Sequence, residues 1–142
     1  RDPQFCQIFI DIAKVMNEQN WWYLDIQGSE PIQFGIYPEG GKYDWHVDQH
    51  PKPVYWVADN PSDKGMVRKI SMTLFMNDPS EYEGGEFDLE IYKPETDCRY
   101  ETFKLKKASA IFFQSDQWHR VRPVTSGIRK SIVAWFYGPP YK

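Results

Sequence analysis

The 142-residue sequence lacks several features that would assign a chain to a broad class of protein. Its two cysteines, Cys6 and Cys98, are too few for a disulfide framework and favour a reducing compartment, so we expect a cytoplasmic protein. No uninterrupted run of about 18 apolar residues occurs, which argues against a membrane-spanning helix. The formal net charge of −3 lacks the positive excess of a nucleic-acid-binding domain. We therefore expect neither nucleic acid nor a membrane as a partner.

The composition that remains is suited to one folded core. Hydrophobic residues make up 41% of the chain and aromatic residues 17%, which excludes a disordered or collagen-like chain. The length is close to the commonest domain size, and no repeat, low-complexity tract or linker interrupts it. We therefore expect a single domain over residues 1–142 that functions as a monomer.

The first 20 residues have the spacing of an amphipathic helix. Asp2 is suited to the N-cap and Pro3 to the first helical position. The apolar positions predict one buried stripe, made of Phe5, Ile8, Phe9, Ile12 and Met16. A supporting helix is expected over about residues 3–20.

After Asn20 the pattern changes to short runs of aromatic and β-branched residues, separated by clusters of Gly, Pro, Asn and Asp. We predict strands near residues 21–27, 32–37, 43–47, 54–57, 68–77, 86–92, 100–105, 109–114, 119–123 and 129–137. The sequence thus predicts a mainly β fold, a jelly roll or double-stranded β-helix over about residues 21–138, with the N-terminal helix supporting it.

The last predicted strand has two different faces. One carries Arg129, Ser131, Val133 and Trp135, and the other carries Ile132, Ala134 and Phe136. Such a strand can bury both sets only inside a sandwich. We expect the second set to pack against the helix.

Histidine is scarce, and two of the three histidines suit a metal site. His46 and Asp48 are two residues apart, which places both on one face of a strand. With His119 from another strand they would form a facial triad of two histidines and one carboxylate, which binds Fe(II) and leaves coordination positions open. The His-x-Asp spacing alone is equally consistent with an exposed turn at a strand end.

Arg129 follows His119 by ten residues, with Ser131 on the same face of the predicted strand. A guanidinium that points into an apolar barrel needs an anionic partner, and arginine binds a carboxylate through two hydrogen bonds. A dicarboxylic cosubstrate would supply that anion, whereas a surface salt bridge is the plainer alternative for Arg129 alone. Hydrolysis by zinc is disfavoured, because catalytic zinc sites prefer three histidines or two with a glutamate, and Arg129 would have no role.

Three segments carry a resemblance that covers about residues 34–138. The first runs from Tyr37 through Pro-Glu-Gly-Gly-Lys-Tyr-Asp-Trp to His46-Val-Asp48. The second is the run from Arg68 to Asp78 with the turn Gly84-Gly85-Glu86-Phe87, and the third runs from Phe112 through His119 to Arg129-Lys-Ser131 and Trp135. In this order the segments resemble the Fe(II)/2-oxoglutarate-dependent dioxygenases, in particular the prolyl 4-hydroxylase-like branch with its PKHD-type bacterial and phage members.

The resemblance implies that His46, Asp48 and His119 bind Fe(II), with 2-oxoglutarate as cosubstrate, O2 as oxidant and ascorbate as a supporting reductant. Arg129 would pair with the distal carboxylate of 2-oxoglutarate. The metal ligands and Arg129 would together form the catalytic set.

Further residues would complete the cosubstrate pocket if the resemblance holds. The hydroxyls of Tyr37 and Ser131 would assist Arg129. Thr73 and Phe75, on one face of the central strand, would line the pocket. Trp135 would border it near the metal, although core packing explains a strand tryptophan equally well.

The activity that the resemblance implies is hydroxylation of a prolyl residue in a protein or peptide, coupled to decarboxylation of 2-oxoglutarate to succinate and CO2. Aromatic side chains suit a proline-rich extended chain, and the candidates near the predicted mouth are Tyr43, Trp45, Trp56 and Trp135. The proline-rich loop 49–65 could form a lid. Two alternatives stay open: hydroxylation of a free amino acid or other small molecule, and a jelly-roll module that binds a metal or ligand without catalysis.

Overall fold

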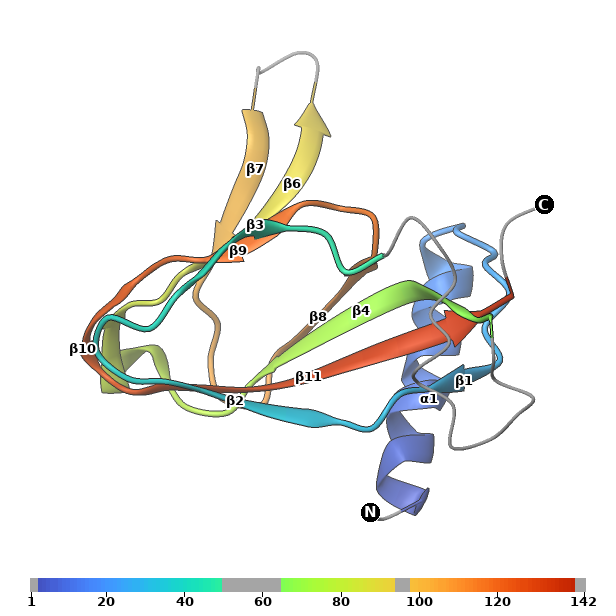
Figure 1. The fold of residues 1–142 in the computed structure, drawn as a ribbon, viewed down its shortest axis with the longest axis horizontal. Helices are drawn as coiled ribbons and strands as arrows, with labels where there is room; N and C mark the ends of the chain where they lie inside the picture. Colours follow the sequence, from blue (N-terminus) through green and yellow to red (C-terminus); the bar gives the residue numbers. More distant parts are fainter. Residues whose placement is uncertain (1–2, 50–64, 94–97, 140–142) are drawn as a thin grey trace.

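Two antiparallel sheets face each other in the computed structural model, which describes residues 3–49, 65–93 and 98–139 (Figure 1). The strand predicted at 54–57 lies outside the described residues, as does most of the loop 49–65. Across the described ranges, none of the helices combines the length and the apolar character that crossing a bilayer requires.

The N-terminal helix α1 spans Pro3–Gln19, but its buried face differs from the predicted stripe. Phe9 and Ala13 are buried, whereas Ile8 and Ile12 are 55% and 38% exposed. Apolar residues occur on two sides of this helix, so its sequence alone does not decide which side is covered. The small side chain of Ala13, which is 0% exposed, lets that side approach the sheet closely.

The strand predicted at 21–27 does not form. Trp21 and Tyr23 have φ angles of 60° and 47°, which interrupt an extended run. The side chain of Asn17 accepts a hydrogen bond from the N–H of Leu24 and donates one to its carbonyl, both at 2.8 Å. A side chain of the helix therefore takes the place of a partner strand. The alternation that suggested a strand reflects burial, because Trp22, Leu24 and Ile26 pack against the core.

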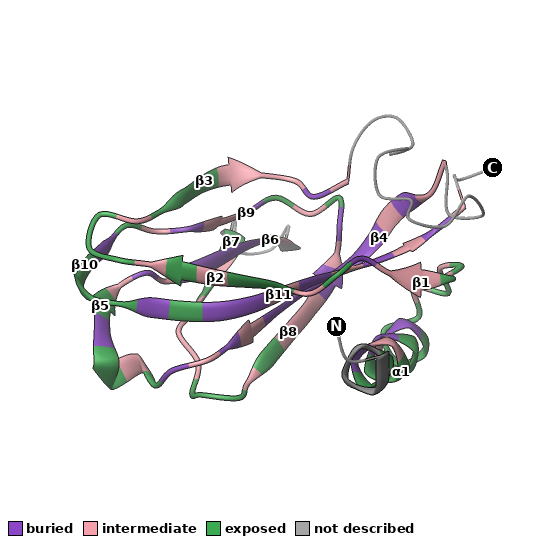
Figure 2. Cartoon of the chain, turned by 60° about the horizontal axis from the view of Figure 1, so that its bottom comes forward, coloured by how far each residue is buried: buried purple, intermediate pink, exposed green. Residues whose placement is uncertain are grey.

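The larger sheet is centred on β11. Its strands are β1 (Gly28–Ser29), β2 (Gln33–Tyr37), β11 (Arg129–Gly138), β4 (Val67–Phe75) and β8 (Ala110–Gln114). Strand β11 pairs with β4 on one side and with β1 and β2 on the other, and β8 pairs with β4. Figure 2 shows buried positions, in purple, along both β11 and β4.

The prediction for the two faces of β11 is confirmed. Ile132, Ala134 and Phe136 form one core cluster with Phe9 and Ala13 of α1. The alternate residues, beginning with Arg129, face the smaller sheet and line a cavity between the sheets.

The smaller sheet closes the other side of that cavity. Its strands, in order, are β3 (Tyr43–His46), β9 (His119–Val121), β6 (Phe87–Lys93) and β7 (Cys98–Phe103). At one end β5 (Tyr82–Gly84), which follows the short helix η2 (Pro79–Glu81), pairs with β10 (Val124–Gly127). The turn residues around β5 and β10 hid these short strands in the sequence. The whole is the predicted double-stranded β-helix with its supporting helix.

Candidate metal centre and cosubstrate pocket

Two histidines and one aspartate meet in the cavity between the sheets. His46 ends β3 and is paired in register with His119, the first residue of β9. The Asp48 Oδ1 atom lies 3.5 Å from His46 Nε2 and 3.3 Å from His119 Nε2. One ligand atom from each residue lies within 4.8 Å of the other two, a spacing that one metal ion can bridge.

Backbone carbonyls set the orientation of both imidazoles. The Nδ1 atom of His46 lies 2.7 Å from the carbonyl oxygen of Asp44, and that of His119 lies 3.0 Å from the carbonyl oxygen of Gln117. Because a carbonyl can only accept, Nδ1 carries the proton in each ring. Each ring therefore directs its Nε2 atom toward Asp48, the orientation that metal-binding histidines adopt.

Asp48 is held by a pair of buried serines. The Ser71 hydroxyl donates to Asp48 Oδ2 at 2.6 Å, and the Ser71 and Ser115 hydroxyl oxygens are 2.9 Å apart. Burial alone would raise the pKa of the Asp48 carboxyl, but hydrogen bonds from the two histidines and Ser71 hold that pKa far below its usual range. Asp48 is thus an anion whose Oδ1 is directed at the two imidazoles.

This donor set fits a particular class of metal. Two imidazole nitrogens and one carboxylate oxygen form the facial triad that binds Fe(II) and leaves positions open for other ligands. The structure brings together the three residues that the sequence singled out for this role, from positions separated by up to 73 residues.

A buried arginine stands at the far end of the cavity. Arg129 is 1% exposed, and its Nε and Nη2 atoms have no hydrogen-bond partner in the described part of the chain. Burial lowers the pKa of the guanidinium, while the Tyr82 and Tyr37 side chains oppose that effect. A buried cation with unused donors fits an anionic ligand, and a carboxylate matches its planar geometry.

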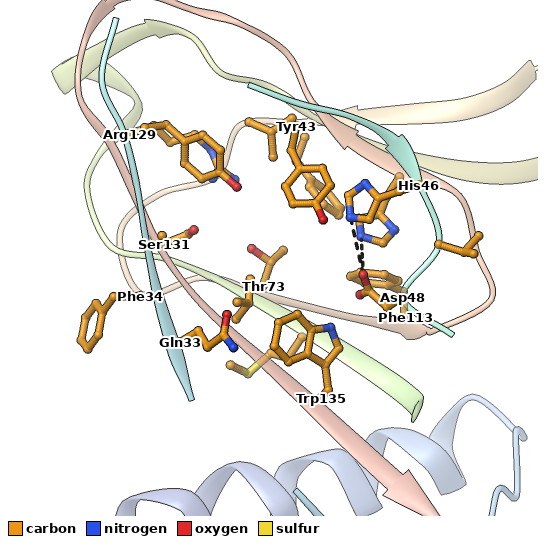
Figure 3. A pocket seen from close by; sticks show the side chains of 18 of the residues that line it. Gln33, Phe34, Tyr43, His46, Asp48, Thr73, Phe113, Arg129, Ser131 and Trp135 are labelled. Atoms are coloured by element: carbon orange, nitrogen blue, oxygen red, sulfur yellow. Dashed lines mark ion pairs between the residues drawn. The ribbon is translucent and has the colours of Figure 1, made fainter. Parts of the chain in front are cut away.

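One cavity of about 460 Å³ joins the triad to Arg129 (Figure 3). The register of the large sheet explains how the other residues meet there, because Arg129 pairs with Tyr37, Val133 with Thr73 and Trp135 with Ser71. The predicted site residues that line the cavity besides the triad and Arg129 are Tyr37, Tyr43, Thr73, Ser131 and Trp135.

Two predicted site residues lie elsewhere, and one is not described. Phe75 is not among the lining residues; its ring centroid lies 5.4 Å from Arg129 Cζ, within the core. The register shift between Tyr43 and His46 turns Trp45 to the outer face of the small sheet, against Tyr100. The prediction that Trp45 borders the mouth is therefore corrected. Trp56 lies outside the described residues.

Sequence reasoning missed several residues of the cavity. Arg68 lines it, with its Cζ 4.0 Å from the centroid of the Trp135 ring and its Nη2 donating to Glu30 Oε1 at 2.8 Å. A register shift in the pairing of β4 with β11 brings Arg68 to the cavity face, so simple alternation from Thr73 does not find it. Ser71, which donates to Asp48 from behind the site, was also missed, although it stands two residues before Thr73 and alternation along the strand would have placed it on the same face. Gln33 and Met72 also line the cavity.

The amino-acid sequence is similar to those of known oxygenases and hydroxylases. A family model described as the 2OG-Fe(II) oxygenase superfamily matches residues 32–137. A PKHD-type hydroxylase from Teredinibacter turnerae is 33% identical over 105 residues, which are 74% of this chain and 42% of that protein. One from Xylella fastidiosa is 37% identical over 105 residues, 74% of this chain and 43% of its own length. The match thus spans about two fifths of these relatives.

Solved structures show the same fold. A prolyl-4-hydroxylase from Pseudomonas putida superposes with a TM-score of 0.67 at 20% identity, over 94% of this chain and 64% of that one. A viral collagen prolyl hydroxylase from Paramecium bursaria chlorella virus 1, solved with 2-oxoglutarate, gives a TM-score of 0.66 at 18% identity, over 96% of this chain and 74% of that one.

Proposed function

The chain belongs to the 2OG-Fe(II) oxygenase superfamily, and we propose that it is an Fe(II)- and 2-oxoglutarate-dependent hydroxylase that acts on a prolyl residue of a protein or peptide. One observation carries the activity: the same cavity holds a buried two-histidine, one-carboxylate set and a buried arginine with unused donors. A binding module without catalysis has no need of both.

His46, Asp48 and His119 hold the iron in this proposal. The carbonyls behind the imidazoles and the hydroxyl of Ser71 behind the carboxylate hold the ligand atoms in place. When bound, the iron supplies the activation of O2 that couples decarboxylation of 2-oxoglutarate to hydroxylation of a C–H bond.

Arg129 selects the cosubstrate by charge and length. A 2-oxo acid with a second carboxylate can chelate the metal at one end and pair with the guanidinium at the other. Tyr37, paired with Arg129 across the sheet, and Ser131, two residues along β11, both line the cavity and offer hydroxyls to the same carboxylate. The apolar rings of Phe75 and Phe87, which are 1% and 2% exposed, keep water from the guanidinium and the triad.

The prolyl substrate is supported by the rim of the cavity and by the two structural neighbours described above, both of which are named prolyl hydroxylases. Tyr43 is 52% exposed and stacks on His46 with ring centroids 3.8 Å apart, and Trp135 borders the other side of the triad (Figure 3). An extended proline-rich chain loses little entropy when it docks on such aromatic surfaces.

The test is succinate release from 2-oxoglutarate with and without a proline-containing peptide, under air with Fe(II). We expect release to depend on the peptide and on both metal-binding histidines, and the peptide to gain the mass of one oxygen atom. His119→Ala is the inactive control. Release with free amino acids but not with peptides would contradict the prolyl-peptide substrate and favour a small-molecule hydroxylase. No release with any of them would contradict the proposed activity.

A further inference from the structure

Three buried side-chain atoms lack a hydrogen-bond partner in the described ranges, and they belong to two residues that meet. They are Arg129 Nε, Arg129 Nη2 and the hydroxyl of Tyr82. Buried polar groups in folded proteins are rarely left unpaired, so a cluster of them marks a place where a partner is expected. Two of the three are donors of a cation, and the third is an oxygen that can accept.

Gly85 is where the two side chains come together. A Cβ atom at this glycine would lie 3.1 Å from Arg129 Cδ and 3.2 Å from Tyr82 Cε2. The φ angle of Gly85 is +65°, so both the backbone and the space favour glycine here. The second glycine of the Gly84-Gly85 turn thus leaves room for the arginine stem and the tyrosine ring to pack side by side.

The ring of Tyr82 is fixed independently of its hydroxyl. Tyr82 opens β5, where it pairs with Gly127 of β10, two residues before Arg129. Its side chain is 3% exposed, and the Lys104 ammonium lies 4.6 Å from the ring centroid while donating to the Tyr82 carbonyl at 2.9 Å. The fold therefore holds the Tyr82 ring beside the Arg129 side chain.

We propose that Tyr82 is a positioning residue for the cosubstrate: its phenol oxygen accepts a hydrogen bond from Arg129 and fixes the plane of the guanidinium for the distal carboxylate. The inference rests on the proposed function, since it requires that the cavity takes 2-oxoglutarate. Tyr82 does not line the cavity, so it acts through Arg129. Arg129 lowers the pKa of the Tyr82 phenol against the larger, opposite effect of burial, as a neighbouring cation does.

The variant Tyr82→Phe tests the role, because it removes the hydroxyl and keeps the ring. Binding is measured without oxygen on the Fe(II)-loaded protein, through the weak visible absorption band of a 2-oxo acid chelated to iron. We expect the dissociation constant of 2-oxoglutarate to rise about tenfold, as for loss of a hydrogen bond to a charged group. The affinity for 2-oxopentanoate, which has a methyl group in place of the distal carboxylate, should not change.

Comparing 2-oxoglutarate with 2-oxopentanoate distinguishes a positioning role of Tyr82 from general damage to the fold. Tyr23→Phe, at a side chain that is 71% exposed, is the matched control and should bind both ligands as the wild type does. The inference would be overturned if Tyr82→Phe bound both ligands more weakly by the same factor, or bound both as the wild type does. The proposed function would still stand in either case, because the wild-type protein would show the band. Absence of the band in the wild type would overturn the proposed function and this inference with it.

Discussion

At the scale of single residues, the site contains two buried charges, Asp48 and Arg129, and the surrounding residues stabilise the first more than the second. Asp48 has three hydrogen-bonding neighbours, whereas the buried Arg129 guanidinium has no carboxylate partner in the described part of the chain. The first arrangement stabilises an anion in place. The second costs stability until an anionic ligand arrives.

Replacing Arg129 by methionine should therefore stabilise the fold and abolish binding of 2-oxoglutarate. We expect Arg129→Met to raise the free energy of unfolding by about 1–2 kcal/mol, because it removes a buried charge without a carboxylate partner. The same variant should lose 2-oxoglutarate binding and keep Fe(II) binding. Urea unfolding and metal titration measure the two effects, and a destabilised variant would show that the guanidinium is already satisfied in the free protein.

The serine behind the metal site gives a second prediction at this scale. Ser71→Ala removes the donor to Asp48 Oδ2, and the loss of such a contact behind a ligand typically weakens metal binding 10- to 100-fold. We expect a decrease of about tenfold in the affinity for Co(II), used as an air-stable probe in place of Fe(II). Ser126→Ala, at an exposed position of β10, is the control and should leave the affinity unchanged. Equal affinities for all three proteins would contradict the supporting role of Ser71.

At the scale of elements, each sheet has an outer face that contributes to stability rather than to the site. On the small sheet, Asp88 is 0% exposed and binds Arg120 Nε and Arg122 Nε, each at 2.7 Å, with Thr102 donating at 2.6 Å. These contacts join β6, β7 and β9. They hold together the sheet that carries His46 and His119.

The Asp88 cluster should make the protein sensitive to acid. Burial raises the pKa of this carboxyl, but the arginines and Thr102 lower it by more, so the folded pKa lies below the unfolded value of about 3.9. Its contribution is therefore complete above about pH 4 and is lost as the pH falls through the folded pKa. Asp88→Asn should lower the free energy of unfolding at pH 7 by about 2–3 kcal/mol, with a shallower loss on acidification.

Urea unfolding at pH 7, 4 and 3 measures both effects. The control is Asp44→Asn, because that side chain is 82% exposed and its ion pair, across the described residues, is with the exposed Lys42. The control should match the wild type at pH 7. Equal acid sensitivity of the wild type and Asp88→Asn would contradict the role of this cluster.

The helix offers a test of which face is buried. Ala13 is 0% exposed against the sheet, whereas Val15 is 48% exposed. Ala13→Leu should lower the free energy of unfolding by about 1–3 kcal/mol through overpacking. Val15→Leu adds apolar volume on the exposed side and should change it by less than about 0.5 kcal/mol. Thermal unfolding of the two variants measures these changes. A larger loss of stability in Val15→Leu than in Ala13→Leu would show that the side of the helix that carries Ile8 and Ile12 is the buried one.

At the scale of the whole molecule, the sequence predicted what depends on periodicity and motif order. The alternation along 129–137 predicted both faces of β11, and the His-x-Asp pair with His119 predicted a cluster that the fold brings within 4.8 Å. The predictions failed where an irregularity in strand pairing breaks the two-residue alternation of side chains between the faces of a sheet. A register shift moves Trp45 outward and another brings Arg68 inward.

Tertiary contacts account for the remaining misses. The segment 21–27 alternates like a strand, yet the side chain of Asn17 pairs with the backbone of Leu24 in its middle. The meeting of Tyr82 and Arg129 depends on the pairing of β5 with β10, which no local pattern signals. Such features arise only when distant segments are brought together, so the local sequence pattern does not predict them.

In the proposed function, one cavity holds iron at His46, Asp48 and His119 and 2-oxoglutarate between that iron and Arg129. The most direct measurement is the anaerobic visible absorption spectrum during titration with Fe(II) and then 2-oxoglutarate, with His119→Ala alongside. We expect a weak charge-transfer band in the wild type that requires both additions and is absent from the variant. A folded protein that binds iron and gives no band would contradict it, and the chain would then be a jelly roll that binds metal without this cosubstrate.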